Sequence, residues 1–279
     1  IIGIIISYLF VFSACDKIEE PYIEEGTSVW NGRKILIYDF TRHKCGNCPR
    51  AHKLIDSYKT TYGDAIVPIA IHGTFFAMTE DNADGKFNYD FRTPIGDILA
   101  GRDFSTDCYY GELFLPMGIV NNLAKESLLA DVNWTEEVEK YISLFPEFEI
   151  RIVNSYCSLG DNIIANINCE ALIESNRNLH INAFVIEDKI IQWQTDYTKE
   201  PSYVENYEHN HVLRAGFIGA FGEAINQNNE EIKIGKTFSK VYSLKIEEEW
   251  KKENCSVVAF VYESDTKEVL QAEMIKFSN

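Results

Sequence analysis

The sequence predicts an α/β domain followed by an all-β sandwich domain. Three observations indicate this. Residues 34–72 contain a short apolar run, a Cys-x-x-Cys motif, a helical pattern and a second apolar run. Beyond residue 146, short segments of strand character follow one another, separated by turn residues. The chain has 279 residues, 46% of them apolar, which suffices for one large or two ordinary domains with real cores.

The first fifteen residues are interpreted as a signal peptide whose beginning is missing. Ten of the first twelve residues are apolar, whereas a membrane-spanning helix needs roughly 20 such residues. The run ends in Phe12-Ser13-Ala14-Cys15, which resembles the lipobox of bacterial lipoproteins. We therefore expect lipidation of Cys15, and a membrane as partner through that anchor. The alternative is a core strand at the start of a domain.

Residues 16–32 are expected to form an acidic tether. The segment includes Glu19, Glu20, Glu24 and Glu25, and it should be extended and weakly ordered. Acidic residues directly after a lipidated cysteine resemble the surface-export signals of some outer-membrane lipoproteins. The whole chain has a formal net charge of −17, which repels phosphate backbones and argues against a nucleic-acid partner.

The α/β domain is expected over residues 33–146 and centres on one βαβ unit. Lys34–Phe40 and Ile66–His72 are strand candidates buried on both faces. Between them lies a helix that tolerates Pro49 in its first turn and ends at Gly63. This connection predicts a parallel pair of strands with a right-handed crossover.

Three shorter elements complete this domain. A helix is predicted over Thr93–Phe104, with Thr93 as its cap. The run Leu115–Val120 is predicted to be a loop that enters a strand. A second helix follows the capping-box pattern of Asn133–Glu136 and ends before Pro146.

The all-β domain is expected over residues 147–279. Several of its segments alternate apolar and polar residues, and Asn, Gly, Asp and Ser separate them. Such a series predicts an immunoglobulin-like β-sandwich. The strand candidates are Phe148–Ser155, Asn162–Leu172, Leu179–Glu187, Ile190–Gln194, Lys236–Ile246, Cys255–Tyr262 and Val269–Phe277.

The motif Cys45-Gly46-Asn47-Cys48 is the strongest chemical signal. A thiolate attacks a disulfide, and a cysteine at a helix N-terminus ionises more easily because the free amides stabilise negative charge. We expect Cys45 just before the helix as the attacking thiol, and Cys48 in its first turn as the resolving thiol. Two intervening residues allow a Cys45–Cys48 disulfide. The preceding Arg42-His43-Lys44 should lower the thiol pKa further.

Three other chemistries use the same motif. Haem attachment is excluded, because it needs a histidine directly after the second cysteine, where Pro49 stands. Zinc is an alternative, with His43 or His52 as a further ligand, but the sequence holds no second Cys-x-x-Cys. We predict neither a metal nor a cofactor. A chemically idle structural disulfide also stays open, since the motif shows a geometry and not a substrate.

The other four cysteines are Cys108, Cys157, Cys169 and Cys255, and their spacing is irregular. A symmetric turn at Gly160-Asp161 would place Ile164 opposite Cys157, so we predict no bridge between Cys157 and Cys169. Buried free thiols are the default for all four.

The motif and its surroundings resemble the thioredoxin superfamily. The strand Ile35–Phe40, the loop length and the two cysteines carry the likeness. The resemblance implies that Asp39, six residues before Cys45, accepts the proton of the resolving thiol; the alternative is a solvated strand residue. It also implies that Pro116 is a cis-proline facing the disulfide. Lys44 stands where the superfamily usually has tryptophan, so the substrate surface must differ.

A closer resemblance is carried by three stretches. They are Phe40–Pro49, Pro116–Asn121 and Tyr207–Arg214, and the last is followed by Phe221-Gly222-Glu223. With them, nearly the whole chain after Cys15 is similar to the Omp28-related outer-membrane lipoprotein family. This resemblance implies a thioredoxin-like domain plus an all-β domain, anchored by lipid at the outer membrane, on its periplasmic or cell-surface face. It implies much less about activity.

The histidines near the end of the third stretch also have a direct interpretation. His209 and His211 would share one face of a strand, a spacing that can bind metal, but no third ligand is apparent. We favour polar residues that fix a loop against the first domain, with Arg214 paired to an acid. His72, at the end of a strand, is more often a core histidine than a catalyst.

Two functions follow from these features. In the first, the protein is a thiol–disulfide oxidoreductase acting on a protein thiol or disulfide: Cys45 attacks, Cys48 resolves, Asp39 handles the proton and Pro116 shapes the groove. In the second, the lipid anchor and the sandwich present a surface-exposed binding or adhesion module, and the disulfide is only a structural staple. The sequence leaves both open.

Overall fold

The structure is a computed structural model that describes residues 30–102 and 107–277. The predictions for the signal segment, Cys15 and most of the tether lie outside these residues. Within them, no helix is both long and apolar enough to cross a membrane.

The described residues form three α-helices and fourteen strands. The helices are α1 (Cys48–Tyr62), α2 (Pro94–Ala100) and α3 (Trp134–Ile142). The strands are β1 (Ile35–Thr41), β2 (Ile66–His72), β3 (Met117–Val120), β4 (Leu129–Ala130), β5 (Phe148–Cys157), β6 (Asn162–Ala171), β7 (Leu179–Glu187), β8 (Ile190–Thr195), β9 (Tyr203–His209), β10 (Val212–Gly216), β11 (Glu223–Ala224), β12 (Thr237–Lys245), β13 (Cys255–Glu263) and β14 (Val269–Lys276).

One sheet of nine described strands runs through the molecule, in the order β14-β13-β7-β10-β2-β1-β3-β4, with β11 added beside β7. β1 and β2 pair in parallel, and β3 pairs antiparallel to β1. β10 joins the two halves of the chain: Val212 pairs with Ala70, and the Ala70 amide donates to the His211 carbonyl at 2.8 Å. The sheet therefore contains strands from both sides of residue 146.

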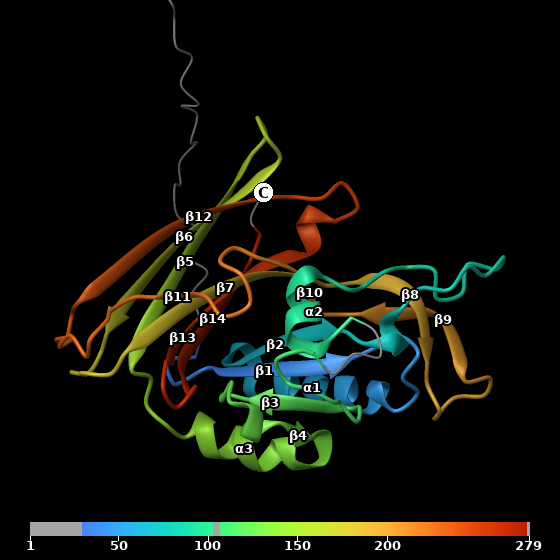
Figure 1. Ribbon diagram of the computed structural model, residues 1–279, viewed down its shortest axis with the longest axis horizontal. Coiled ribbons are helices and arrows are strands. Elements are labelled where there is room, and N and C mark those ends of the chain that lie inside the picture. Colours follow the sequence, from blue (N-terminus) through green and yellow to red (C-terminus); the bar gives the residue numbers. More distant parts are fainter. Residues whose placement is uncertain (1–29, 103–106, 278–279) are drawn as a thin grey trace, which may run out of the picture.

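Two smaller sheets flank this one. β12, β6 and β5 form a sheet at one end of the molecule, and the β8–β9 hairpin extends at the other end (Figure 1). β5 and β6 pack their apolar faces against β7, β13 and β14, so the second half of the chain contains two stacked sheets. This agrees with the predicted change from α/β to β-rich structure.

Alternation along the strands divides the interior into separate cores. Ile35 and Ile37 of β1 face α1 and α3, whereas Tyr38 and Phe40 face the opposite side. On that opposite side Tyr38 meets Phe184 of β7, with ring centroids 6.3 Å apart. Asp39 is two residues after Ile37 on the same strand, so its side chain points to the same face of the sheet, which α1 covers.

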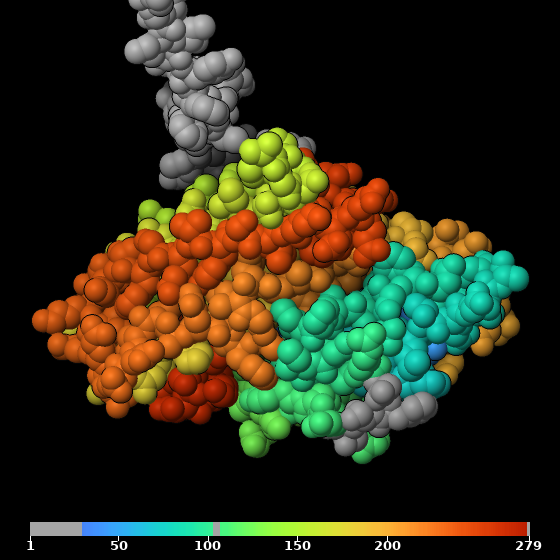
Figure 2. Space-filling model, turned by 45° about the horizontal axis from the view of Figure 1, so that its top comes forward, coloured from blue at the N-terminus to red at the C-terminus, as the bar shows by residue number. Residues whose placement is uncertain are grey.

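The segment that follows β10 lies against the segment that contains α2 (Figure 2). Tyr109 and Phe221 are in contact there, with ring centroids 5.0 Å apart, and Ala220 joins the same core as Ile95 and Leu99. The first and second halves of the chain thus share a core as well as a sheet.

Most predicted elements are confirmed, some with shifted ends. β2 and β7 have the predicted limits, and β3 lies within the run predicted to enter a strand. Thr93 caps α2, its hydroxyl accepting from the Gly96 amide at 3.0 Å. This helix ends at Ala100 and not at Phe104, because Gly101 takes a positive φ of 83°.

Other expectations were wrong in detail. Asn133 precedes α3 but its side chain makes no capping hydrogen bond, so the predicted capping box is not formed. His209 and His211 do not share a strand face. His209 ends β9, whereas His211 lies in the turn before β10 with a φ of 58°. The boundary predicted at residues 146–147 falls between α3 and β5 and stays a prediction.

Candidate functional site

Cys45 and Cys48 are joined by a disulfide, with their Cα atoms 5.5 Å apart, a usual separation for such a bond. Cys48 is the first residue of α1 and is fully buried. Cys45 lies three residues earlier and is half-buried. A partner molecule can therefore reach Cys45 but not Cys48, which matches the order of attack expected from the sequence.

Local hydrogen bonds explain why the motif takes this shape. After β1, the Cys45 amide donates to the Arg42 carbonyl at 3.1 Å, and the Cys48 amide donates to the Cys45 carbonyl at 3.3 Å. Pro49 then occupies the first turn of α1, where its missing N–H costs nothing. The turn places Cys45 at the positive end of the helix, which favours a thiolate.

The β8–β9 hairpin holds the motif from the second half of the chain. The Thr195 amide donates to the His43 carbonyl at 2.8 Å, and the Tyr197 amide donates to the Gly46 carbonyl at 2.9 Å. The buried amide of Gln194 donates to the Cys45 carbonyl at 2.9 Å. Sequence reasoning missed this contact, since no local pattern links residues about 150 positions apart.

Gly46 is required by the same contact. A Cβ atom at this position would lie 2.5 Å from the ring of Tyr197, closer than any non-bonded carbon pair can approach. The glycine of the motif therefore makes room for the hairpin.

The basic residues before the motif differ from the expectation. His43 is buried, and this burial lowers its pKa to about 4, so it carries no charge near neutral pH. Lys44 pairs with Glu80 at 3.1 Å. Of the three basic residues, Arg42 and Lys44 are the ones that bring positive charge. The Arg42 guanidinium lies over the Phe76 ring, and the Lys44 ammonium lies over the Phe75 ring.

Asp39 is fully buried beneath α1. Burial, and next the charge of Asp131, raise the pKa of its carboxyl from 3.8 to about 8. Among the described residues, neither oxygen accepts a hydrogen bond. His52 of α1 approaches most closely, with its Nε2 atom 3.5 Å from Oδ2. The pKa of the Asp39 carboxyl is thus close to that of an ordinary thiol, about 8.5, so a proton can pass between the two groups at little cost.

Two further residues lie near this end of β1. Cys48 and His52 are four residues apart on α1 and share one helix face, so the buried cysteine lies one turn from the histidine that approaches Asp39. The peptide bond between Leu115 and Pro116 is cis, and the next residue, Met117, pairs with Phe40 at the end of β1. The role of Pro116 toward a substrate stays a prediction.

A cluster of histidines lies beside this site and surrounds Phe91. The rings of His72 and His209 lie 4.4 and 4.5 Å from the Phe91 ring, centroid to centroid, and His43 lies 5.6 Å away. Burial lowers the pKa of both His72 and His209 well below 6.5. His72 is buried in the core as predicted, but neither of its ring nitrogens has a hydrogen-bond partner among the described residues.

Within the described part of the chain, no group of three or more His, Cys, Asp or Glu is arranged to hold a metal. His211 instead pairs with Asp188, Nδ1 to Oδ1, at 2.9 Å. Arg214 pairs with Glu187 at 3.1 Å, as predicted for an arginine among many acids.

The four other cysteines within the described residues are free. Cys169 and Cys255 are buried, and burial raises the pKa of each thiol to about 12. Cys108 and Cys157 are half-buried, not buried as expected. The prediction that Cys157 and Cys169 form no disulfide is confirmed. The predicted register was wrong, because Cys157 pairs with Asn162 across the β5–β6 ladder and not with Ile164.

Comparison with known families identifies the chain. The family model of outer membrane protein Omp28 matches residues 105–278. The chain belongs to the Omp28 family. This confirms the family predicted from the sequence and agrees with the predicted outer-membrane location. The match begins beyond the Cys-x-x-Cys motif, so Omp28 membership by itself says nothing about redox chemistry.

Solved structures also match this Omp28-family chain. HBP35 of Porphyromonas gingivalis is similar, with a TM-score of 0.59 and 14% identity over 89% of this chain and 76% of that chain. A domain of the outer membrane lipoprotein Omp28 from Porphyromonas gingivalis also matches, with a TM-score of 0.33 and 21% identity over 48% of this chain and 89% of that chain. No curated protein matches in sequence.

Proposed function

We propose that this Omp28-family protein is a lipid-anchored thiol–disulfide oxidoreductase of the outer membrane that acts through Cys45 and Cys48. The observation that carries the proposal is the buried Asp39, whose raised pKa lies close to that of a thiol, beneath the helix that begins at Cys48. A buried carboxyl without hydrogen bonds destabilises the fold, which argues that Asp39 is retained for a function, and proton transfer to and from Cys48 is such a function.

The topology supports a thioredoxin-like class for residues 33–146. The strand order β2-β1-β3-β4 and the parallel β1–β2 pair with α1 between the two strands fit that class. The stacked sheets of β5, β6, β7, β13 and β14 support a sandwich of the immunoglobulin-like class beyond residue 146.

The exchange proceeds in two balanced steps. The Cys45 thiolate attacks a substrate disulfide and forms a mixed disulfide, releasing one substrate thiolate. Asp39 then takes the proton of Cys48, and the new thiolate attacks the sulfur of Cys45 and releases the second substrate thiolate. The two electrons of the enzyme dithiol thereby reduce the substrate disulfide, and the enzyme ends oxidised. The reverse sequence oxidises a substrate dithiol.

Trapping of partners tests this proposal. A Cys48→Ser variant cannot resolve the mixed disulfide, so it should accumulate covalent complexes with outer-membrane or periplasmic proteins that disappear on reduction. Alkylation of Cys45 in the reduced protein should be fast at pH 7. Cys108→Ser, which removes another half-buried thiol, is the matched control and should trap nothing. Ordinary Cys45 reactivity without trapped partners would overturn the proposal.

The lipid anchor is a separate part of the proposal and rests on Cys15 within the lipobox-like stretch. Expression with a complete signal peptide should give a protein that incorporates labelled fatty acid and sediments with membranes. A Cys15→Ser variant should lose the label and appear in the soluble fraction. Retention of the label in that variant would exclude Cys15 as the lipidation site.

A second candidate function is a surface-binding module in which the disulfide is only structural. The hydrogen bonds from the β8–β9 hairpin to the carbonyls of His43, Cys45 and Gly46 favour it, because they tie the motif to the second half of the chain. If a double Cys45→Ser and Cys48→Ser variant lost stability yet kept cellular function, this candidate would replace the oxidoreductase.

A further inference from the structure

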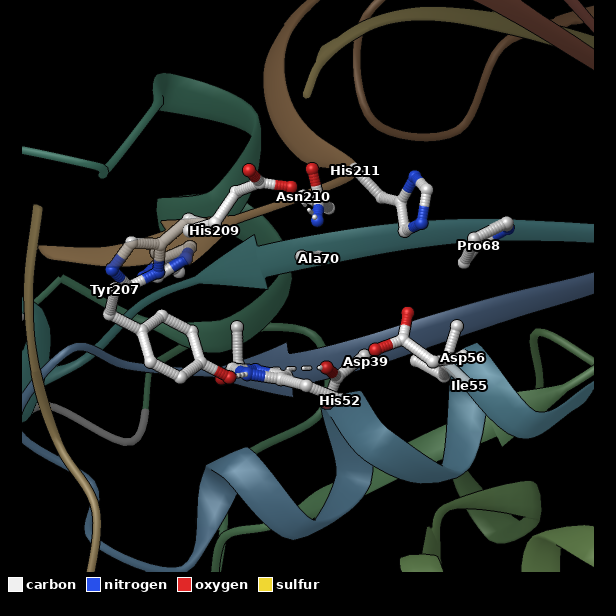
Figure 3. Close-up of a pocket in the computed structure, with 13 residues that line it drawn as sticks. Asp39, His52, Ile55, Asp56, Pro68, Ala70, Tyr207, His209, Asn210 and His211 are labelled. Carbon is white, nitrogen blue, oxygen red and sulfur yellow. Dashed lines mark hydrogen bonds and ion pairs between the residues drawn. The ribbon is translucent and has the colours of Figure 1, made fainter. Parts of the chain in front are cut away.

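Three side chains from distant parts of the sequence form a continuous chain of contacts behind the disulfide. Figure 3 shows Tyr207 of β9, His52 of α1 and Asp39 of β1 in line. The Tyr207 hydroxyl lies 2.7 Å from His52 Nδ1, and His52 Nε2 lies 3.5 Å from Asp39 Oδ2. The hairpin from the second half of the chain thereby reaches the buried carboxyl.

The contacts of His52 couple its tautomer to the hydroxyl groups of Tyr207 and Thr41. Burial lowers its pKa to about 4, so the ring is neutral and holds one proton. When the Tyr207 hydroxyl donates to Nδ1, this proton stays on Nε2. Nε2 faces the Thr41 hydroxyl at 2.8 Å and, farther away, the Asp39 carboxyl. The direction of the hydrogen bond between Tyr207 and Nδ1 is therefore coupled to whether Nε2 presents a donor or a lone pair toward Thr41 and Asp39.

A cavity lies beside this chain of contacts. Its volume is about 50 Å³, which exceeds the roughly 15 Å³ that one water molecule requires. The lining includes Asp39, His52 and Tyr207, and also Asp56 and Asn210 (Figure 3). The cavity therefore has room for water beside the side chains of Asp39, His52 and Tyr207.

We propose that Tyr207, acting through His52, is a positioning residue that controls proton exchange at Asp39. The β8–β9 hairpin is then part of the redox site and not only a support for it. The use of this control in disulfide exchange rests on the proposed function. The coupling between Tyr207 and Asp39 is a property of the folded protein and holds whether or not the disulfide is catalytic.

Other titratable and charged groups also face this chain of contacts, and each element packed against it contributes some. They are Lys53 and Asp56 of α1, Asp131 before α3, His72 of β2, Asp196 in the β8–β9 hairpin, His209 of β9 and His211 before β10. Among the described residues, the ring nitrogens of His52 have two hydrogen-bond partners, the Tyr207 hydroxyl at Nδ1 and the Thr41 hydroxyl at Nε2, and the two together set its tautomer.

Tyr207→Phe tests the inference with the loss of one oxygen atom. Without the hydroxyl donor, His52 can carry its proton on Nδ1 and turn a lone pair toward Asp39, which disfavours the carboxylate. The titration midpoint of the Asp39 carboxyl, followed by carbon-13 NMR of the oxidised protein, should rise by about half a pH unit. Asp39→Asn assigns the signal, and His52→Leu should raise the midpoint further.

Tyr203→Phe is the matched control, because Tyr203 lies on the same strand but packs on Lys86 and Phe87. It should leave the Asp39 midpoint unchanged. In the reduced protein, the pH profile of disulfide formation should shift with the NMR midpoint for Tyr207→Phe. An unchanged Asp39 titration in both Tyr207→Phe and His52→Leu would overturn the inference. A shifted titration in a protein without exchange activity would retain it and reject only the proposed function.

Discussion

At the scale of single residues, Asp39 opposes the stability of the protein. Its pKa is about 8 in the folded chain against 3.8 for an exposed carboxyl. Between these values the folded chain holds a proton that the unfolded chain has released. The free energy of unfolding therefore falls as the pH rises from 4 toward 8. Such a residue is one that selection for stability alone would replace.

Asp39→Asn should therefore stabilise the oxidised protein increasingly with pH. The variant minus wild-type difference in the free energy of unfolding should grow by about 1.4 kcal/mol for each pH unit between pH 5 and 7. Urea unfolding at pH 5, 6 and 7 measures it. Any cost of fitting the amide into the site is the same at each pH. The pH dependence of the free-energy difference therefore reports the ionisation of Asp39 alone. A difference that is constant with pH would contradict the raised pKa.

At the scale of elements, the β8–β9 hairpin and the Cys-x-x-Cys turn fit together through Gly46 and Tyr197. Gly46→Ala should push the Tyr197 ring away and destabilise the protein by about 1–3 kcal/mol. In a Tyr197→Ala background the same change should cost much less, since the obstructing ring is absent. Thermal unfolding of the four proteins gives the coupling energy, and Asn47→Ala, at the exposed neighbour, is the control. Additive effects would mean that the contact is not energetically important.

The histidine cluster between β2, β9 and the loop that carries Phe91 should make the fold sensitive to acid. His43 and His52 have pKa values of about 4, and those of His72 and His209 are also depressed. Below the ordinary value of 6.5 the unfolded chain binds more protons, so stability is complete above that pH and falls on acidification toward pH 4.

Each of these histidines should contribute about 1.4 kcal/mol to the loss of stability for each pH unit below 6.5. His72→Leu removes one of them while keeping an apolar contact with Phe91. Its unfolding free energy should therefore decline less steeply between pH 6 and pH 5 than that of the wild type. Chemical denaturation at these two pH values is the measurement, and equal slopes would show that His72 does not titrate as a buried neutral group.

The sequence could predict the elements whose signals are local. The apolar runs of β1 and β2, Pro49 in the first turn of α1 and the Cys-x-x-Cys motif all depend on neighbours in the chain. β9 was missed because its residues Tyr203–His209 are mostly exposed or half-buried and polar. His52 and Tyr207 were missed as a pair, since their contact spans 155 positions and neither has a neighbouring pattern that points to it.

At the scale of the whole molecule, the two halves of the chain are built around shared strands. β7 and β13 contribute Phe184 and Phe260 to the core under α2, and Val185 and Val257 to the core under β5 and β6. Tyr38 of β1 contacts both phenylalanines, at 6.3 Å between ring centroids in each case. Neither half can therefore open its core without exposing apolar surface that belongs to the other.

This sharing predicts a single unfolding transition for the oxidised protein. Trp134, buried beneath the first-half sheet, reports that half when the other three tryptophans are replaced by phenylalanine. The buried thiols of Cys169 and Cys255 report the second half through pulsed labelling. Both probes should give the same urea midpoint. Phe260→Ala, whose cost is about 3–5 kcal/mol, should lower both midpoints equally. Two separate midpoints, or a shift confined to the thiols, would instead show that residues 33–146 fold independently, because only an autonomous first domain can keep its Trp134 environment after the shared strands have come apart.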